Sequence, residues 1–255
     1  MPTALFLSPH LDDVAFSCGG LAALLHDRGW VTIMVTVFTR SIHPATGFAL
    51  ACQLDKGLGP EVDYMALRRA EDAEAARILG LEARSLDFPE APHRGYESAP
   101  ALFGPVLESD RMVQDLIPAF SVLRDALQPA LVLAPQGLGD HVDHQIVIQV
   151  VQAVFSPLTL AFYRDTPYAI RNPSALVRVV TAGILPVDVE IGAAMDRKVA
   201  ASSAYGSQVG FQFGGVAPLG DALRAFAERE GGGRAAERFL AAPGVPFGGL
   251  ERATL

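Results

Sequence analysis

The 255-residue sequence predicts a single α/β domain built on a Rossmann-like, mostly parallel sheet flanked by helices. Short apolar runs alternate with segments of helical periodicity through the first two thirds of the chain. The first three such segments, residues 4–8, 16–28 and 31–38, form a compact strand–helix–strand unit, whose crossover is right-handed and parallel. Half of the residues are apolar and 19% are charged, a composition that supports a continuous core.

The expected strands of the core are short runs of apolar or β-branched residues, as in parallel strands that are buried on both faces. They cover residues 4–8, 31–38, 83–88, 131–134 and 158–163. The expected helices repeat apolar residues at helical spacing and cover residues 16–28, 65–79, 110–127 and 141–155. Gly29 and Gly80 follow the first two helices directly, where glycine commonly ends a helix.

The last third of the sequence alternates less clearly. Strands are expected at residues 176–181 and 187–191, and helices at residues 196–205 and 221–230. No linker composition separates this part from the rest. We therefore expect one domain over residues 1–255, with the Rossmann-like core at about 1–165 and additional C-terminal strands and helices at about 166–255.

Two long segments, residues 39–62 and 89–109, show no clear periodicity and contain several prolines and glycines. Connections of this length inside a compact domain are usually functional. Both follow predicted strands, and ligands bind beyond the carboxyl ends of the strands in such sheets. We therefore expect these segments to frame a substrate cleft.

Charge and apolar content exclude several classes of protein. The formal net charge is −8 and no basic run occurs, so no nucleic-acid partner is expected. The best candidate for a membrane span, residues 175–195, contains a proline and three charged residues, so no span is expected. The sequence begins without a signal-peptide pattern, and Cys18 and Cys52 are far apart, so a cytoplasmic location without disulfides is the default. The oligomeric state stays open, a homo-oligomer included.

Two polar clusters carry the chemistry that the sequence offers. Residues 8–13 (SPHLDD) follow the first predicted strand directly, and residues 141–144 (HVDH) come shortly after the fourth. Both clusters are therefore expected at the same edge of the sheet. One such cluster alone is usually a helix cap or a solvated polar group. Two clusters at equivalent strand ends indicate a shared site.

The residue types in these clusters suit a catalytic zinc site. Such a site has three protein ligands and an open position for water. The ion lowers the pKa of that water and polarises a substrate carbonyl. A separate carboxylate must act as the base, because a carboxylate bound to the metal has committed its lone pairs. The clusters together contain three histidines and three aspartates, which supply this set.

With these clusters the sequence resembles the PIG-L (LmbE-like) family of zinc-dependent N-acetylglucosaminyl deacetylases. The family pattern is P-H-P-D-D after the first strand and H-x-D-H later, matched here by residues 9–13 (PHLDD) and 141–144 (HVDH). Weaker matches, such as residues 68–71 and 163–168, extend the resemblance over nearly the whole chain. The resemblance implies a hydrolase that removes an N-acetyl group from an N-acetylglucosamine-type sugar or glycoconjugate. It implies Zn²⁺ as the cofactor, with Fe²⁺ or another divalent ion as the alternative.

Carried over position by position, the resemblance also implies roles for individual residues. The metal ligands would be His10, Asp13 and His144. Asp12 would be the general base. His141 would lie near the developing oxyanion and help to protonate the leaving amine, and Asp143 would orient His141 or tune its pKa.

Two positions depart from the family pattern. Leu11 replaces the usual proline between His10 and Asp12, which makes the turn less rigid. Gly139 stands where some members place a tyrosine that assists the oxyanion, two residues before the H-x-D-H segment. That helper is therefore missing or comes from elsewhere in the chain.

Four further residues are candidates for contacts with the substrate. Arg68 belongs to one of the weaker family matches, and Arg94 lies in the long segment 89–109. Asp165 and Tyr168 follow the fifth predicted strand, at the edge of the sheet where ligands bind. For Arg68 the alternative is a solvated ion pair with Glu71, three residues further along the same helix.

Other functions stay open at this point. An amidase for a different acyl group, such as a lipid chain or a thiol conjugate, would use the same metal chemistry. A sugar-binding relative with an inactive site is disfavoured by Asp12, because a structural metal site has no use for a spare carboxylate. A nucleotide-binding protein is disfavoured because the sequence lacks G-x-G-x-x-G.

Overall fold

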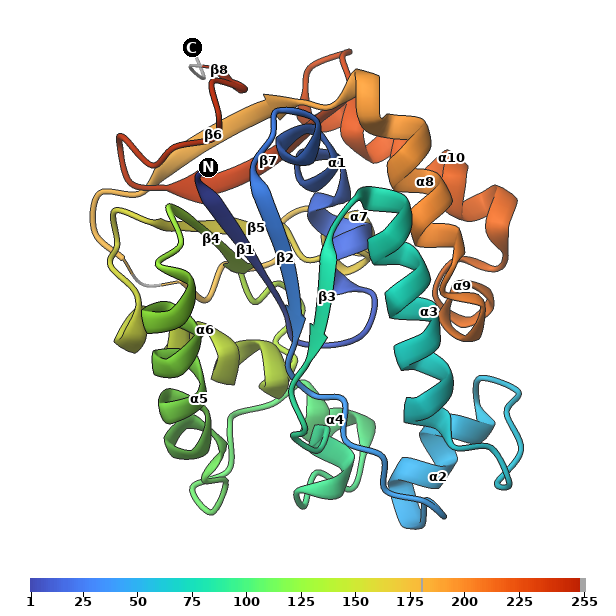
Figure 1. Ribbon diagram of the computed structural model, residues 1–255. Helices are drawn as coiled ribbons and strands as arrows, with labels where there is room; N and C mark the ends of the chain where they lie inside the picture. The colour runs from blue at the N-terminus through green and yellow to red at the C-terminus, as the bar shows by residue number, and fades with distance from the viewer. Residues whose placement is uncertain (180, 253–255) are drawn as a thin grey trace.

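The computed structural model describes residues 1–179 and 181–252 and confirms the predicted α/β class. Within these residues the central sheet has the strand order β3-β2-β1-β4-β5-β7-β6-β8 (Figure 1). The strands are β1 (Thr3–Ser8), β2 (Val31–Thr36), β3 (Glu82–Ser85), β4 (Leu131–Pro135), β5 (Leu160–Tyr163), β6 (Leu185–Glu190), β7 (Ala236–Ala241) and β8 (Glu251–Arg252). Neighbouring strands from β3 to β5 pair in parallel, and β7, β6 and β8 extend the sheet with antiparallel pairs.

Helices cover both faces of this sheet. They are α1 (Asp13–Asp27), α2 (Gly47–Leu54), α3 (Tyr64–Leu79), α4 (Ala99–Leu102), α5 (Met112–Leu127), α6 (Val142–Val154), α7 (Tyr168–Arg171), α8 (Met195–Ser203), α9 (Gly206–Phe213) and α10 (Val216–Glu230), with 3₁₀ turns η1 (Ala91–His93) and η2 (Gly192–Ala194). α5 and α6 lie on one face, and α1, α3, α8 and α10 lie on the other (Figure 1).

β1 illustrates why the central strands are apolar throughout. Ala4 and Phe6 belong to the core that contains α1 and α3, whereas Leu5 and Leu7 belong to the core that contains α5 and α6. Successive side chains of a strand point to opposite faces of its sheet. Because helices cover both faces, all four side chains are fully buried, and no position of β1 favours a polar residue.

One predicted strand is wrong, and β7 is a strand that the sequence pattern did not indicate. Residues 176–179 of the predicted strand 176–181 have no regular secondary structure, and residue 180 lies outside the described residues. Leu176 is 81% exposed. β7 takes the place beside β5, where Phe239 pairs with both Tyr163 and Val187. A β-branched run forms a strand only where a neighbouring strand is available, and β6 confirms the strand predicted near residues 187–191.

Both long segments contain short helices that their irregular sequences did not predict. α2 lies within residues 39–62, and η1 and α4 lie within residues 89–109. α2 and α4 are found beyond the C-terminal ends of β2 and β3 (Figure 1). Ala49 and Gln53 are the buried residues of α2, so this helix buries too narrow a face to produce a clear helical pattern.

α1 is interrupted in its middle, at the Gly19-Gly20 pair. The helix geometry breaks at Cys18, where φ is −134° and ψ is 21°. The Glu237 carboxylate accepts hydrogen bonds from the main-chain N–H groups of Gly20 and Leu21, at 2.9 and 2.8 Å. A Cβ atom at Gly20 would lie 2.8 Å from the side chain of Ile191. The glycine pair therefore serves close packing and not a nucleotide-binding loop.

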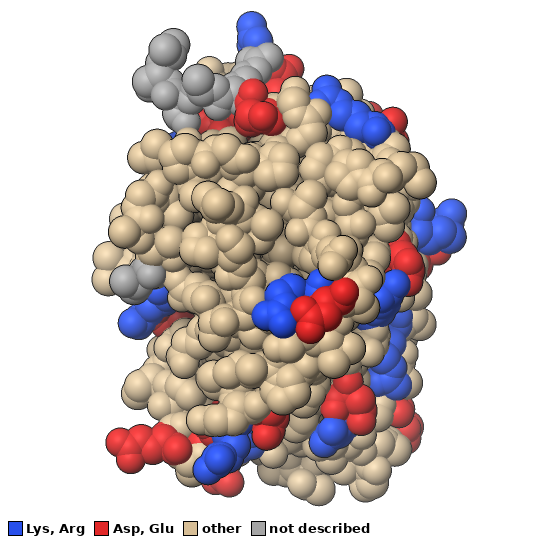
Figure 2. Space-filling model, turned by 60° about the vertical axis from the view of Figure 1, so that its left-hand side comes forward, with Lys and Arg blue, Asp and Glu red and all other residues tan. Residues whose placement is uncertain are grey.

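The surface carries charges of both signs. On the face shown in Figure 2, Lys and Arg side chains lie beside Asp and Glu side chains and do not form a continuous basic surface. This face therefore has no electrostatic footprint for a nucleic acid. Among the helices of the described residues, none combines the length and the apolar character that crossing a bilayer requires.

Candidate metal centre

The first polar cluster forms a tight turn between β1 and α1. The His10 N–H donates a hydrogen bond to Asp13 Oδ2 at 2.7 Å. Ser8 Oγ donates to the His10 carbonyl oxygen at 2.6 Å and accepts from the Val14 N–H at 3.3 Å. Leu11 is fully buried. These contacts order the turn although it lacks the proline of the family pattern.

Asp12 occupies a strained position in this turn. Its φ of 153° lies in a region that residues other than glycine rarely adopt. Arg68 restrains both sides of the residue, because Nη2 donates to the Leu11 carbonyl oxygen at 3.2 Å and lies 3.9 Å from Asp12 Oδ1. Such strain persists only where the surroundings over-determine the conformation, and it is common at active sites. The turn thereby directs the Asp12 carboxylate to Arg68 and the Asp13 carboxylate to the histidines.

The second polar cluster begins α6. His141 directly precedes the helix, and its Nδ1 accepts a hydrogen bond from the Asp143 N–H at 3.2 Å. Burial, with the nearby His10 charge, lowers the pKa of His141 well below its ordinary value. The ring is therefore neutral near neutral pH, and because Nδ1 accepts, its proton is on Nε2. His141 is an N–H donor at Nε2.

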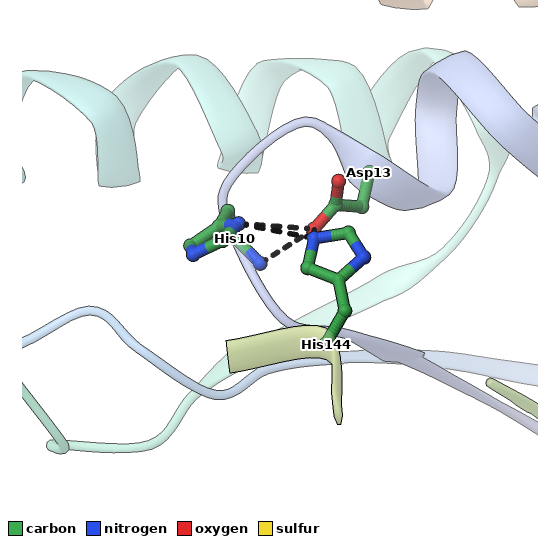
Figure 3. A group of neighbouring side chains, drawn as sticks. All are labelled: His10, Asp13 and His144. Atoms are coloured by element: carbon green, nitrogen blue, oxygen red, sulfur yellow. Dashed lines mark hydrogen bonds and ion pairs between the residues drawn. The ribbon is translucent and has the colours of Figure 1, made fainter. Parts of the chain in front are cut away.

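His10, Asp13 and His144 converge from the two clusters and point toward one another (Figure 3). His144 Nε2 lies 3.3 Å from Asp13 Oδ2 and 3.3 Å from His10 Nδ1, and these last two atoms are 3.5 Å apart. Zinc binds such atoms at about 2.0–2.2 Å, so tetrahedral coordination separates them by roughly 3.3–3.6 Å. The residues present therefore fit one divalent ion with a fourth position left over.

Each histidine of this group has a further carboxylate behind it. His144 Nδ1 lies 2.5 Å from Asp165 Oδ1, and His10 Nε2 lies 2.9 Å from Asp143 Oδ2. Both aspartates are fully buried. A carboxylate at the far nitrogen fixes the tautomer and the ring orientation of a ligating histidine. Both histidines are thus prepared to present the other nitrogen to an ion.

A second group of ligand atoms, from His10, His141 and Asp143, also lies within 4.8 Å of one another. It does not suit a second ion beside the first. The His10 atom facing Asp143 is Nε2, which carries the ring proton when Nδ1 is the ligand. Arg94 Nη2, 2.6 Å from Asp143 Oδ1, adds a positive charge at the same place. His141 and Asp143 are better described as neighbours that orient His10 than as ligands of a second ion.

Asp12 stays outside the ligand group and has the properties of a base. Burial raises the pKa of its carboxyl to about 7, and the Arg68 guanidinium opposes that rise. A general base is most effective when its pKa lies near the working pH. Asp12 is thus a carboxylate beside the His10–Asp13–His144 group that is not itself one of the candidate ligands.

A cavity of about 270 Å³ opens onto this centre. His10, Asp12, Asp13 and His141 are among the residues that line it. Both long segments contribute walls, as their sequences predicted, and α9 contributes a third. The lining residues from these walls include Ile42, Phe48, Ala49, Cys52, Lys56, Tyr64, Glu90, His93, Leu102, Phe103, Gln208 and Phe211. The lining of the cavity thus mixes apolar side chains with polar and charged ones.

The structure separates the four predicted substrate contacts into two pairs. Arg68 and Tyr168 line the cavity. Arg94 lies instead behind Asp143, with its side chain 7% exposed and Nη2 also 3.1 Å from Asp110 Oδ2. Asp165 has no exposed surface and lies behind His144. These placements correct the expectations for Arg94 and Asp165, because neither side chain can reach a substrate.

Asp143 acts on His141 in both of the expected ways, because its main-chain N–H orients the ring and its charge opposes the fall in the pKa of His141. The Asp143 carboxylate binds His10 and Arg94, and its Oδ2 is 3.9 Å from His141 Nδ1. Asp143 orients His141 through its main-chain N–H. The side chain is turned away because α6 starts between the two residues and the helix carries Asp143 toward His10.

Several residues of the site carried no sequence signal. Glu90 pairs with Arg68 at 2.6 Å, and Phe103 packs edge-on against His141 with ring centroids 5.4 Å apart. His93, which belongs to a weaker family match at residues 91–94 but is expected to be an ordinary surface or loop histidine, lines the cavity. All three lie in segment 89–109, where an irregular sequence hides which side chains face inward. The pointers to them were the prediction that this segment frames the cleft and the weaker family match at residues 91–94.

The fold and this centre together define an α/β protein with a candidate divalent-metal site at the carboxyl edge of its sheet. Residues 5–155 match the PIG-L family, described as GlcNAc-PI de-N-acetylase. The match covers more than half of the chain, so the protein belongs to the PIG-L family, as its sequence motifs indicated.

Curated relatives and solved structures agree with this assignment. The chain is 37% identical over 213 residues to the 2'-N-acetylparomamine deacetylase of Streptomyces fradiae, covering 80% of this chain and 72% of the relative. It is 27% identical to the protein of the same name from Niallia circulans, over 64% of this chain and 66% of the relative. A crystal structure of a deacetylase in the biosynthesis pathway of teicoplanin matches with a TM-score of 0.82 at 25% identity, covering 93% of this chain and 96% of the other.

Proposed function

We propose that the protein is a divalent-metal-dependent hydrolase that removes the acetyl group from the nitrogen of an N-acetylated amino sugar within a glycoside. The observation that carries this proposal is the His10–Asp13–His144 group with the separate carboxylate of Asp12 beside it. The names of the relatives, which are deacetylases of an aminoglycoside precursor and of a glycopeptide pathway, support the substrate class.

In this proposal His10, Asp13 and His144 hold a divalent ion, Zn²⁺ or Fe²⁺. When bound, such an ion polarises the amide carbonyl and lowers the pKa of water. Asp12 accepts the proton of the attacking water, so that a C–O bond forms at the carbonyl carbon. The same proton then goes from Asp12 to the amine nitrogen as the C–N bond breaks. A carboxyl with a pKa of about 7 can serve in both directions.

His141 supports the carbonyl oxygen as negative charge develops there. Its Nε2–H is a donor, since Nδ1 is occupied by the Asp143 N–H. Being neutral, the ring stabilises an oxyanion by a hydrogen bond and does not release a full proton early in the reaction. Arg68 and Tyr168, which line the cavity, are proposed to contact the substrate.

The test is an assay of amine release on metal-stripped protein reloaded with Zn²⁺ or, without oxygen, Fe²⁺. The panel contains N-acetylglucosamine, N,N'-diacetylchitobiose, 2'-N-acetylparomamine and N-octanoylglucosamine. We expect amine release from at least one N-acetylated sugar, saturating near one ion per chain and absent in the stripped protein. Activity that persists in fully stripped protein would exclude the metal-dependent mechanism. No amine release from any acetylated sugar would exclude the substrate class.

The octanoyl substrate addresses a second candidate function, an amidase for longer acyl groups. Phe48, Leu102 and Phe211 give the cavity apolar walls that could accept an acyl chain. Burial of such a chain contributes roughly 0.8 kcal/mol for each CH₂ group. A kcat/KM that is higher for the octanoyl than for the acetyl substrate would favour this candidate.

A further inference from the structure

Gly139 and Tyr168 share one space beside the metal centre. Gly139 has φ of 85°, and a Cβ atom at this position would lie 2.5 Å from Cδ1 of the Tyr168 ring. Such a separation does not occur between real side chains. The tyrosine ring therefore stands where any larger residue at position 139 would place its side chain, and the glycine is required for the ring to be there.

The ring is held in place from two other sides. It packs edge-on against the His144 imidazole, with ring centroids 5.9 Å apart, and against Phe103 at 6.0 Å. Phe103 in turn packs against His141. Tyr168 therefore contacts a candidate metal ligand directly and reaches the candidate oxyanion donor through one intervening ring.

The Tyr168 hydroxyl differs from those of the other tyrosines. Tyr64, Tyr96, Tyr163 and Tyr205 each have a hydrogen-bond partner for the hydroxyl. Tyr168 has none among the described residues, and its hydroxyl is not a buried atom. A half-buried tyrosine usually finds such a partner. Since Tyr168 lines the cavity, its free O–H is available to a molecule that occupies the cavity.

A phenol O–H is a hydrogen-bond donor, so the free hydroxyl of Tyr168 can donate to a negative charge that develops on a molecule in the cavity.

We propose that Tyr168 is a catalytic residue whose hydroxyl donates a hydrogen bond to the carbonyl oxygen of the scissile amide, together with Nε2–H of His141. The inference rests on the proposed function and extends it. It also answers the question that Gly139 raises in the sequence, since a ring from the segment after β5 occupies the space beside position 139. A pair of donors from different elements fixes the direction of the carbonyl bond, which one donor alone does not.

The test compares Tyr168→Phe, which keeps the ring, with Tyr163→Phe, the same chemical change at a hydroxyl that binds the Leu7 carbonyl away from the cavity. Tyr168→Phe should lower kcat on the order of 100- to 1,000-fold, as loss of an oxyanion donor does, with KM and metal content nearly unchanged. Tyr163→Phe should leave kcat unchanged and can lower Tm. A kcat for Tyr168→Phe within threefold of wild type would overturn the proposal, as would a change confined to KM.

A second variant tests whether Gly139 makes room for the Tyr168 ring. Gly139→Ala should displace the ring and lower kcat, and Gly29→Ala controls for the cost of a side chain at positive φ, because φ is 77° there and nothing lies within 4 Å. In the double variant Tyr168→Phe/Gly139→Ala, the loss in kcat should not exceed the larger single loss by more than about threefold, since both changes remove one interaction. If the fold-losses in kcat of the two single variants multiply in the double variant, Gly139 acts independently of the Tyr168 hydroxyl. That result would overturn the proposed link between the two residues.

Binding of a tetrahedral probe separates this inference from the proposed function. The probe is the methylphosphonamide of glucosamine, whose phosphoryl oxygens resemble the oxyanion, and calorimetry on zinc-loaded protein measures Kd. Tyr168→Phe should weaken binding at least tenfold even if no acetylated sugar in the panel is hydrolysed. Equal affinity of variant and wild type within twofold, or no binding by the wild type, would count against Tyr168 whatever the activity assay shows.

Discussion

Asp165 lies directly behind His144, with Oδ1 2.5 Å from Nδ1 of the imidazole. Its other oxygen, Oδ2, accepts hydrogen bonds from the main-chain N–H groups of Gln136 and Leu138, at 3.0 and 3.1 Å. The carboxylate therefore ties the candidate metal ligand to the loop after β4. Two main-chain N–H groups donate to Oδ2, and His144 Nδ1 carries the ring proton and donates to Oδ1 when Nε2 binds an ion, so an ionised carboxylate then satisfies all three partners.

Asp165→Asn should therefore weaken metal binding although Asp165 is no ligand. An amide can accept on one side only, so either His144 or the two main-chain N–H groups of Gln136 and Leu138 lose their partner. We expect a 10- to 100-fold lower affinity for Zn²⁺, of the kind seen when outer carboxylates are removed. Competition with a chromophoric chelator measures it. Asp87→Asn is the matched control, because the Asp87 side chain is 81% exposed, and equal affinities in the two variants would contradict the role.

Asp12 and Asp13 are adjacent and chemically identical, yet opposite outcomes are expected for them. Asp13→Ala should lose the metal, and activity with it, because Oδ2 contacts both histidines of the group. Asp12→Asn should keep the metal and bind substrate, but turnover should fall on the order of 100- to 10,000-fold, as for loss of a general base. Elemental analysis and single-turnover rates decide the matter. Metal loss in Asp12→Asn with retention in Asp13→Ala would reverse the two roles.

Arg68 should affect Asp12 without affecting the metal. Its guanidinium binds Glu90, the Leu11 carbonyl and, at 3.9 Å, the Asp12 carboxylate, a set that the single ammonium of lysine cannot reproduce. Arg68→Lys should retain metal and lose most turnover. Arg68→Met should also lower the free energy of unfolding by about 3–5 kcal/mol, since buried carboxylates are left unpaired.

Adding Glu90→Gln to Arg68→Met controls for the unpaired charge. Stability should recover in part, because one of the orphaned carboxylates is gone, whereas turnover should not, because Asp12 stays unrestrained. Urea denaturation and steady-state kinetics on the same samples separate the two effects. Recovery of turnover along with stability would show that Arg68 acts only through folding.

The buried Lys198–Glu237 pair should contribute far more to stability than an exposed ion pair does. Lys198 Nζ lies 2.6 Å from Glu237 Oε1, both side chains are at most 4% exposed, and Glu237 also holds the broken middle of α1. Lys198→Met should cost about 3–5 kcal/mol of unfolding free energy, because the carboxylate is left buried and unpaired. Arg224→Met is the control, since its pair with the exposed Asp196 is worth about 0–1 kcal/mol. Similar losses in both variants, measured in urea, would refute the distinction.

Local sequence was sufficient to predict that His10, Asp13 and His144 lie close together. His10 and Asp13 lie within one turn after β1, and His144 lies in the first turn of α6, so each position follows from a strand end and a short motif. The same logic failed for Arg94 and Asp165. They also follow strand ends, but whether a side chain faces the cavity or the back of a histidine depends on neighbours from distant parts of the chain.

The sequence by itself determined the α/β class, the parallel core and the two polar clusters that supply the candidate metal ligands. These depend on hydrophobic periodicity and on spacings of a few residues, which the local chain geometry translates directly into structure. Only the tertiary structure decided that β7 and not residues 176–179 pairs with β5, and that Tyr168 fills the space beside Gly139. In both cases, segments far apart in the sequence compete for the same sheet edge or the same volume. No local sequence pattern shows which segment occupies it.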